Sequence, residues 1–161
     1  IINNNTYKIL NTIKSRCIEF KFFFTLSEKK KILNNIIKQY ADDFDLTKID
    51  ECFYFASAGN ILKYSLILRT NNVDLLKDKL SCIFYLIDRY KQKNDPQILT
   101  FVSLLIELFY NELSVKNNNK LNLYFFNKFK LIKQIHDAKK FNLDKKNLFI
   151  SIRGMLENET K

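Results

Sequence analysis

Residues that interrupt regular structure are scarce in this chain, because its 161 residues include two glycines and one proline. A fold built from many strands and tight turns needs such residues often, so this composition disfavours an all-β protein. Hydrophobic residues make up 47% of the chain, which is enough for a substantial core. We therefore predict a mainly α-helical protein of one domain or of two small ones.

Cysteine and histidine are also scarce, which limits the chemistry available within the chain. Cys17, Cys52 and Cys82 match no zinc or redox spacing, and an odd count favours a reduced cytosolic protein over a secreted one. His136 is the single histidine, so the chain contains no histidine-based metal cluster or catalytic triad, and a half-exposed helix position is its expected role. The sequence predicts no metal site.

A long apolar run is missing as well. The most apolar stretch, residues 98–110, contains Glu107 and covers about 13 residues, too few to cross a bilayer. We expect a buried helix there, and no contact with a membrane. No signal-peptide pattern opens the chain, so we expect a cytoplasmic protein. Because Ile1 is not methionine and a strand pattern begins at once, we interpret the sequence as a fragment.

The charge is strongly basic, at a formal net +10. A basic excess is typical of nucleic-acid binding, but heavy use of Lys, Asn, Ile and Phe also reflects AT-rich codons. For the lysines near the C-terminus, DNA contact is one interpretation and a solvated face is the default; these are Lys128, Lys130, Lys133, Lys139 and Lys140. Only four arginines occur, so Arg16 is a candidate position where a planar, bidentate guanidinium is required.

The N-terminal residues follow the pattern of an α/β segment. We predict the end of a strand at Ile1-Ile2, a polar loop, and a short helix over residues 7–14 with Thr6 as its N-cap. Apolar and charged residues then alternate over residues 18–22, which predicts a half-buried strand. The order strand, loop, helix, strand is that of the end of a nucleotide-binding domain.

Helices fill the rest of the chain. Three short ones are predicted at about residues 27–40, 47–56 and 60–70. Ser27 is the predicted N-cap of the first helix. No capping box is expected there, because Lys30 rather than Glu occupies the third helical position. Longer ones are predicted at residues 75–90, 97–113, 120–141 and 145–156, with Pro96 in a first turn and Asp144 as a cap. The three Phe residues at 22–24 are expected to pack at the hinge before the short helices. The longer helices are expected to form an antiparallel bundle. The predicted bundle core, part of which could instead line a subunit interface, consists of Phe101, Leu105, Leu108, Phe109, Leu123, Phe126, Phe129 and Ile132.

The segment Ser15-Arg16-Cys17 lies at the junction of the short helix and the predicted strand. A guanidinium held there could project towards a γ-phosphate and stabilise charge during phosphoryl transfer. The alternative is a surface arginine that caps the last carbonyls of the short helix, and spacing alone favours this alternative.

A family resemblance helps to decide between these two roles of Arg16. Residues 8–22, KILNTIKSRCIEFKF, resemble AAA+ clamp-loader subunits from after sensor 1 through the Ser-Arg-Cys arginine finger. Asn4 falls in the position of the sensor-1 loop, and residues 57–63, SAGNILK, resemble the sensor-2 turn and helix with Lys63 in place of arginine. Residues 137–148, DAKKFNLDKKNL, are similar to the last helices of bacterial delta-prime subunits. The first match is the most specific, and all three occur in the family's order.

By this resemblance the chain is identified as the C-terminal portion of a delta-prime subunit of the bacterial DNA polymerase III clamp loader. The resemblance implies the end of an AAA+ core over residues 1–23, a three-helix lid over residues 24–73 and a helical collar for oligomerisation over residues 74–161. It implies a stator that hydrolyses no ATP and is not an enzyme on its own. Arg16, flanked by Ser15 and Cys17, would complete the ATP–Mg site of a neighbouring subunit.

The implied setting is DNA replication. The partners would be the gamma/tau and delta subunits and, through the complex, the sliding clamp and primer–template DNA. No cofactor is expected on this chain, although Asn4 and Lys63 hold the family's nucleotide-sensing positions. Lysine at 63 loses a bidentate phosphate contact, which suits a subunit without turnover but also fits AT-rich drift.

Two alternatives remain open. An intact phosphate loop upstream of Ile1 would indicate an ATP-hydrolysing gamma/tau subunit of the same complex. A chance match at Ser-Arg-Cys would leave an all-helical adaptor or nucleic-acid-binding module.

Overall fold

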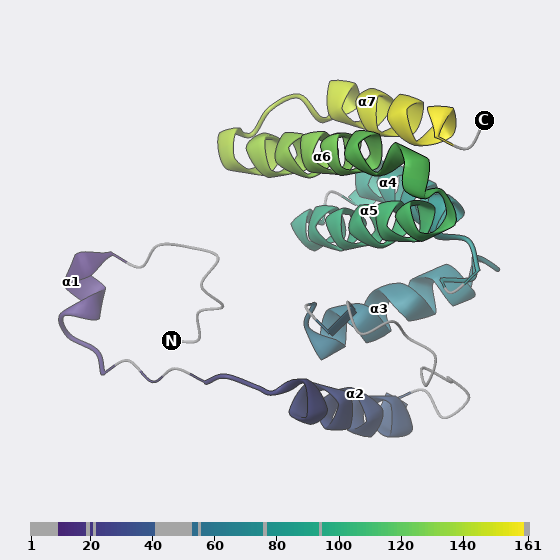
Figure 1. Cartoon of the computed structure of the whole chain (residues 1–161). Helices are drawn as coiled ribbons and strands as arrows, with labels where there is room; N and C mark the ends of the chain where they lie inside the picture. Colours follow the sequence, from purple (N-terminus) through teal and green to yellow (C-terminus); the bar gives the residue numbers. More distant parts are fainter. Residues whose placement is uncertain are drawn as a thin grey trace.

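Every regular element in the described part of the chain is a helix. The computed structural model describes residues 10–159 except residues 19, 21, 41–52, 55, 76 and 94. Figure 1 shows the helices in order: α1 Asn11–Lys14, α2 Leu26–Tyr40, α3 Ala58–Arg69, α4 Lys79–Lys93, α5 Pro96–Lys116, the 3-10 turn η2 Asn118–Lys120, α6 Leu121–Phe141 and α7 Lys145–Asn158. The predicted mainly α fold is confirmed. The predictions for residues 1–9, and most of the helix predicted at 47–56, lie outside the described residues.

The four longer predicted helices form one packed body. α5 packs against α4 and α6, and α7 packs against α6 and α4. Polar contacts tie the same helices together: Lys79 of α4 pairs with Glu112 of α5, and Arg153 of α7 pairs with Asp88 of α4 at 3.1 Å. The bundle expected from the sequence is therefore present, with α5 at its centre.

The central position of α5 follows from its composition. Its buried residues lie on several sides of the helix: Ile98, Leu99, Phe101, Val102, Leu105, Ile106, Leu108, Phe109 and Tyr110. Burial of each large apolar side chain contributes roughly 1.5–3 kcal/mol, so this helix holds much of the core energy. By length and composition α5 could cross a membrane, but half of its most apolar window is buried inside the protein. That is the position of a core helix, as expected for residues 98–110.

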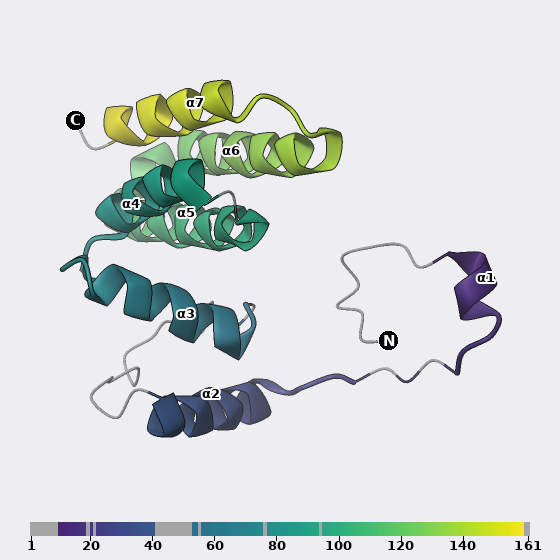
Figure 2. The same cartoon turned by 180° about the vertical axis from the view of Figure 1, so that it is seen from behind.

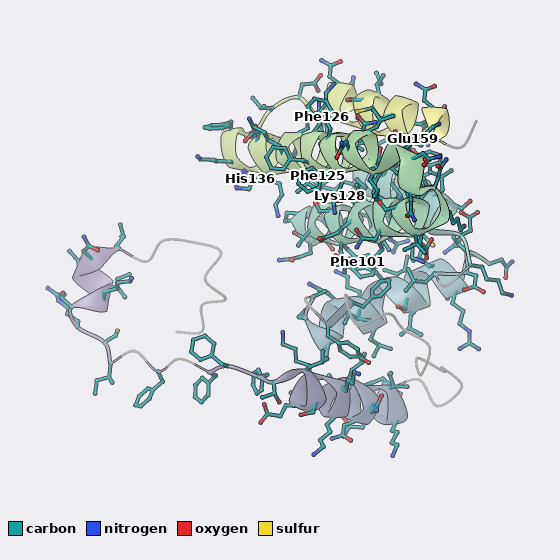
Figure 3. The ribbon with its side chains drawn as sticks, viewed as in Figure 1. Phe101, Phe125, Phe126, Lys128, His136 and Glu159 are labelled. Atoms are coloured by element: carbon teal, nitrogen blue, oxygen red, sulfur yellow. The ribbon has the colours of Figure 1, made fainter. Side chains whose placement is uncertain are left out.

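A second layer, made of α2 and α3, lies beside the bundle in both views (Figures 1 and 2). Leu33 and Ile37 of α2 are buried, and α2 packs against α3. Phe101 of α5 joins the two layers, because its ring lies 4.9 Å from Tyr64 of α3 and 6.1 Å from Phe53 (Figure 3). The cores of the two layers are thus continuous.

The helix ends confirm two of the predicted positions and correct two others, and the N-cap of α1 is Leu10 rather than Thr6. Asp144 accepts a hydrogen bond from the Lys146 amide at 3.1 Å, and Pro96 occupies the first turn of α5, as predicted. Ser27 is not the cap of α2. Thr25 is, because its Oγ1 accepts from the Glu28 amide and Glu28 Oε2 accepts from the Thr25 amide at 2.7 Å. This reciprocal pair is a capping box, one that the prediction denied.

The predicted strand over residues 18–22 is not present at the residues described there. Ile18, Phe20 and Phe22 have no strand assignment and are exposed, Ile18 at 84% and Phe22 at 80%. A strand requires a hydrogen-bonded partner, and the described part of the chain contains none for this segment. The alternation of apolar and charged residues is real, but it does not form a sheet here.

The predicted bundle core is correct for α5 and wrong for most of α6. Phe101, Leu105, Leu108 and Phe109 are buried, and Ile132 is half-buried. The three exposed members, all on α6, are Leu123, Phe126 and Phe129. The buried face of α6 is instead formed by Tyr124, Leu131, Ile135 and Ala138.

Candidate functional site

The Ser15-Arg16-Cys17 segment is a turn that closes α1. The amides of Ser15, Arg16 and Cys17 donate to the carbonyls of Asn11, Ile13 and Lys14 at 2.9, 3.1 and 3.4 Å. Ser15 Oγ donates to the carbonyl of Thr12 at 3.1 Å. All four carbonyls of this short helix therefore already have partners. The guanidinium of Arg16 is not needed as a C-terminal cap, which was the alternative role for this residue.

The Arg16 side chain is exposed, and no other described residue pairs with it. α1 lies away from the helical layers in both views (Figures 1 and 2), joined to α2 by an extended segment. A guanidinium without an internal partner, carried outside the packed body, is available to an anion on another molecule. Cys17 beside it is a free, exposed thiol.

Large apolar side chains follow Arg16 directly. Ile18, Phe20, Phe22, Phe23 and Phe24 are all exposed. The expectation that residues 22–24 pack at the hinge is therefore wrong for the described chain. A run of this kind exceeds what a soluble surface usually carries, and such runs mark contact with another surface. Arg16 and an apolar contact segment thus lie next to each other in the sequence.

Lys63, the predicted nucleotide-sensing position, has an internal partner. Its Nζ lies 2.6 Å from Asp95 Oδ2, which also accepts from the Tyr64 hydroxyl at 3.3 Å. Asp95 Oδ1 accepts from the Gln97 amide at 3.0 Å and so caps α5. The hydrogen bond from Lys63 holds the pKa of the Asp95 carboxyl below its ordinary value. In this structure Lys63 links α3 to α5.

The predicted site residues do not form one site within the chain. Arg16 lies on the separated N-terminal segment and Lys63 on α3, while Asn4 lies outside the described residues. Among the described residues no group of His, Cys, Asp and Glu side chains is placed to hold a metal. Cys82 is buried, which raises the pKa of its thiol to about 12, so it is inert at neutral pH.

A second candidate surface lies on α6. Phe125, Phe126 and Phe129 of this helix are each more than half exposed, and the helix also carries five lysines. Figure 3 labels Phe125, Phe126 and Lys128. A pocket of about 260 Å³ adjoins this surface, between the end of α5 and the start of α6. It is lined by Tyr110, Ser114, Leu121, Asn122, Tyr124, Phe125 and Lys128.

Two features of these candidate sites, the Asp95 cap of α5 and the exposed phenylalanines of α6, were not predicted, although the sequence contains a signal for each. Asp95 directly before Pro96 is the pattern of an N-cap followed by proline at the first helical position. Phe125 and Phe129 stand four residues apart and thus share one helix face. Their exposure is decided by which face α7 and α5 cover, and this is a tertiary property.

No protein-family model matches the chain, and no curated protein and no solved structure matches it either.

Proposed function

We propose that the chain is the C-terminal portion of a stator subunit, of the delta-prime kind, in a bacterial clamp loader. In this proposal Arg16 acts in trans on ATP–Mg bound by a neighbouring gamma/tau subunit, and the chain itself hydrolyses nothing. The α4–α7 bundle serves as the collar that joins the ring with the delta and gamma/tau subunits. The proposed place of work is the cytoplasm, on the sliding clamp and primer–template DNA.

One observation supports the proposal above the others. The carbonyls at the end of α1 are filled by backbone amides and by Ser15, so Arg16 has no structural task among the described residues. A guanidinium aimed at a transferring phosphoryl group stabilises the charge of the transition state, and in trans such residues contribute about 10³–10⁵-fold in rate. The exposed apolar segment after Arg16 supplies a surface through which a neighbour could hold it in position.

The internal pairing of Lys63 agrees with a subunit that does not turn over nucleotide. A lysine 2.6 Å from Asp95 would have to give up this ion pair before it could contact a phosphate. Lysine also offers a point charge where the family's arginine offers a bidentate fork. Under this proposal Lys63 is a structural link between lid and collar, and Arg16 alone retains the chemistry.

The test is ATP hydrolysis by the assembled complex. The full-length protein with Arg16→Ala should assemble with gamma/tau and delta subunits as the wild type does, while DNA-dependent hydrolysis falls. Lys14→Ala is the matched control, because it removes one positive charge from the same exposed helix and should leave hydrolysis unchanged. Unchanged hydrolysis and clamp loading with Arg16→Ala would refute the role in trans.

Two other results would favour the alternative functions. ATP hydrolysis by the isolated full-length protein would indicate a gamma/tau subunit. Failure to assemble with gamma/tau and delta subunits would leave the all-helical adaptor or nucleic-acid-binding module.

A further inference from the structure

The outward face of α6 carries a regular series of aromatic and basic side chains. Phe125, Phe129, Lys133, His136 and Lys140 follow one another at intervals of four, four, three and four residues, so they lie along one side of the helix. We name this series the aromatic–lysine stripe. All five residues are exposed. At 1.5 Å per residue the stripe is about 22 Å long.

Lysines outnumber acidic residues on α6, and the Glu159 carboxylate at the end of α7 accepts a hydrogen bond from Asn127 of α6 at 2.6 Å. α6 contains five lysines and one acidic residue, Asp137, whose carboxylate lies 3.5 Å from His136. Two of the lysines are engaged internally, since Lys128 donates to Asn111 and Lys139 donates to Thr100. Lys130, Lys133 and Lys140 have no carboxylate partner in the described part of the chain. Of these, Lys133 and Lys140 belong to the stripe, so a polyanion would meet two ammonium groups along it that have no carboxylate partner among the described residues.

The pocket beside the stripe adds a second feature. Phe125 belongs to both, so the stripe leads into a space of about 260 Å³ that Tyr124 and Lys128 also line. This volume lies below the roughly 300–1,000 Å³ typical of pockets for whole small molecules. A single flat ring with its polar edge fits such a space better than a complete cofactor. Asn122 and Ser114 provide polar groups for that edge.

Charge decides which partner suits the stripe. If a second copy of the chain met it through the same face, like charges would be brought together, which is unfavourable. An extended polyanion with flat apolar rings gains from both kinds of side chain, because its phosphates meet ammonium groups and its rings stack on phenylalanine. We propose that the aromatic–lysine stripe binds a few nucleotides of single-stranded nucleic acid, with one base at the pocket beside Phe125.

The inference goes beyond the proposed function and does not depend on it. It uses α6 and the end of α5, and Arg16 has no part in it. If the chain binds single strands through α6 and Arg16→Ala leaves ATP hydrolysis unchanged, this inference stands and the proposed role of Arg16 is refuted.

The test is fluorescence anisotropy of labelled oligo(dT) and oligo(U), about 20 nucleotides long, with the full chain. Binding should weaken as salt rises from roughly 50 to 200 mM, because bound phosphates release counterions. Phe129→Ala should weaken binding at fixed salt by about tenfold through lost stacking. The pair Lys133→Gln and Lys140→Gln should make the slope of log affinity against log salt shallower by about 1.4.

Matched controls come from α2. Tyr40→Ala removes an exposed ring and the pair Lys31→Gln and Lys38→Gln removes two exposed charges, each far along the chain from α6. Tyr40→Ala should not weaken binding as Phe129→Ala does, and the α2 lysine pair should not make the salt dependence shallower as the α6 lysine pair does. A preference for oligo(dT) or oligo(U) would identify which kind of single strand is bound.

Three results would overturn the inference. The first is no salt-sensitive binding of either oligonucleotide. The second is an equal loss in the α2 and α6 variants, which would indicate diffuse attraction by net charge. The third is a dimer, seen by light scattering and abolished by Phe129→Ala, which would make the face a contact between copies.

Discussion

Lys63 Nζ and Asp95 Oδ2 lie 2.6 Å apart, and this ion pair joins α3 to the first turn of α5. The lysine side chain is 49% exposed and the aspartate side chain 26%, so solvent screens the pair substantially. Asp95 has further tasks, because it accepts from Tyr64 and caps α5. The two partners of one ion pair therefore matter unequally to stability.

That asymmetry can be measured by urea unfolding. We expect Lys63→Ala to lower the free energy of unfolding by no more than about 1 kcal/mol. Asp95→Ala should cost about 1–2 kcal/mol, because the cap of α5 is lost together with the pair. The double variant should give a coupling energy of about 0.2–1 kcal/mol. Equal costs for the two single variants would contradict this account.

The same carboxylate predicts a response to acid. Its folded-state pKa is depressed below the ordinary value of 3.8, first by the hydrogen bond from Lys63, so its contribution to stability is fully present above that value. The contribution is lost as pH falls through 3.8 towards the folded-state pKa. Asp95→Asn keeps a capping side chain and removes this titration. Unfolding by urea at a series of pH values should show a smaller loss of stability for Asp95→Asn than for the wild type below about pH 4. Parallel curves would refute the role of Asp95.

Two buried tyrosines offer a contrast in hydrogen bonding. Burial is the main cause that raises the pKa of both hydroxyls, yet Tyr64 donates to Asp95 whereas the Tyr110 hydroxyl is buried without a partner among the described residues. Tyr64→Phe should lower the free energy of unfolding by about 1 kcal/mol. Tyr110→Phe should leave it unchanged or raise it, because an unsatisfied hydroxyl is removed. Thermal or urea unfolding of the two variants checks this, and a larger loss for Tyr110→Phe would show that its hydroxyl has a partner.

The corrected assignment of core and surface in the bundle can be tested with one buried residue and one exposed residue. Leu105 is fully buried in α5 and Phe129 is 60% exposed on α6. Leu105→Ala should cost about 2–5 kcal/mol of unfolding free energy, since it leaves a cavity. Phe129→Ala should change stability by about 0.5 kcal/mol or less, as surface substitutions usually do. A large loss for Phe129→Ala would restore the core role that the sequence suggested.

Local signals predicted the helices well, and tertiary contacts decided what the sequence could not. The scarcity of glycine and proline and the helical spacing of apolar residues were sufficient to predict α2 and α3, and α4 to α7. The caps at Asp144 and Pro96 follow from nearest neighbours. The N-cap of α2 was placed two residues too late, at Ser27, so the capping box of Thr25 and Glu28 was missed.

The errors share one physical cause. Phe126 and Phe129 are apolar and at helical spacing, and only the positions of α5 and α7 determine that these rings face away from the core. The strand predicted at residues 18–22 required a partner strand, which periodicity within the segment cannot supply. For Arg16, spacing suggested a capping role, and the hydrogen bonds that fill the α1 carbonyls became visible only in three dimensions.

The proposal for Arg16 is tested most directly by single-turnover ATP hydrolysis in the assembled clamp loader, with Arg16→Lys beside Arg16→Ala. The account predicts intact assembly and a loss of about 10³–10⁵-fold at the neighbouring ATP site with alanine. It predicts only partial recovery with lysine, because a point charge replaces a planar fork. Wild-type hydrolysis in both variants would contradict the claim that this guanidinium acts on a neighbour's nucleotide.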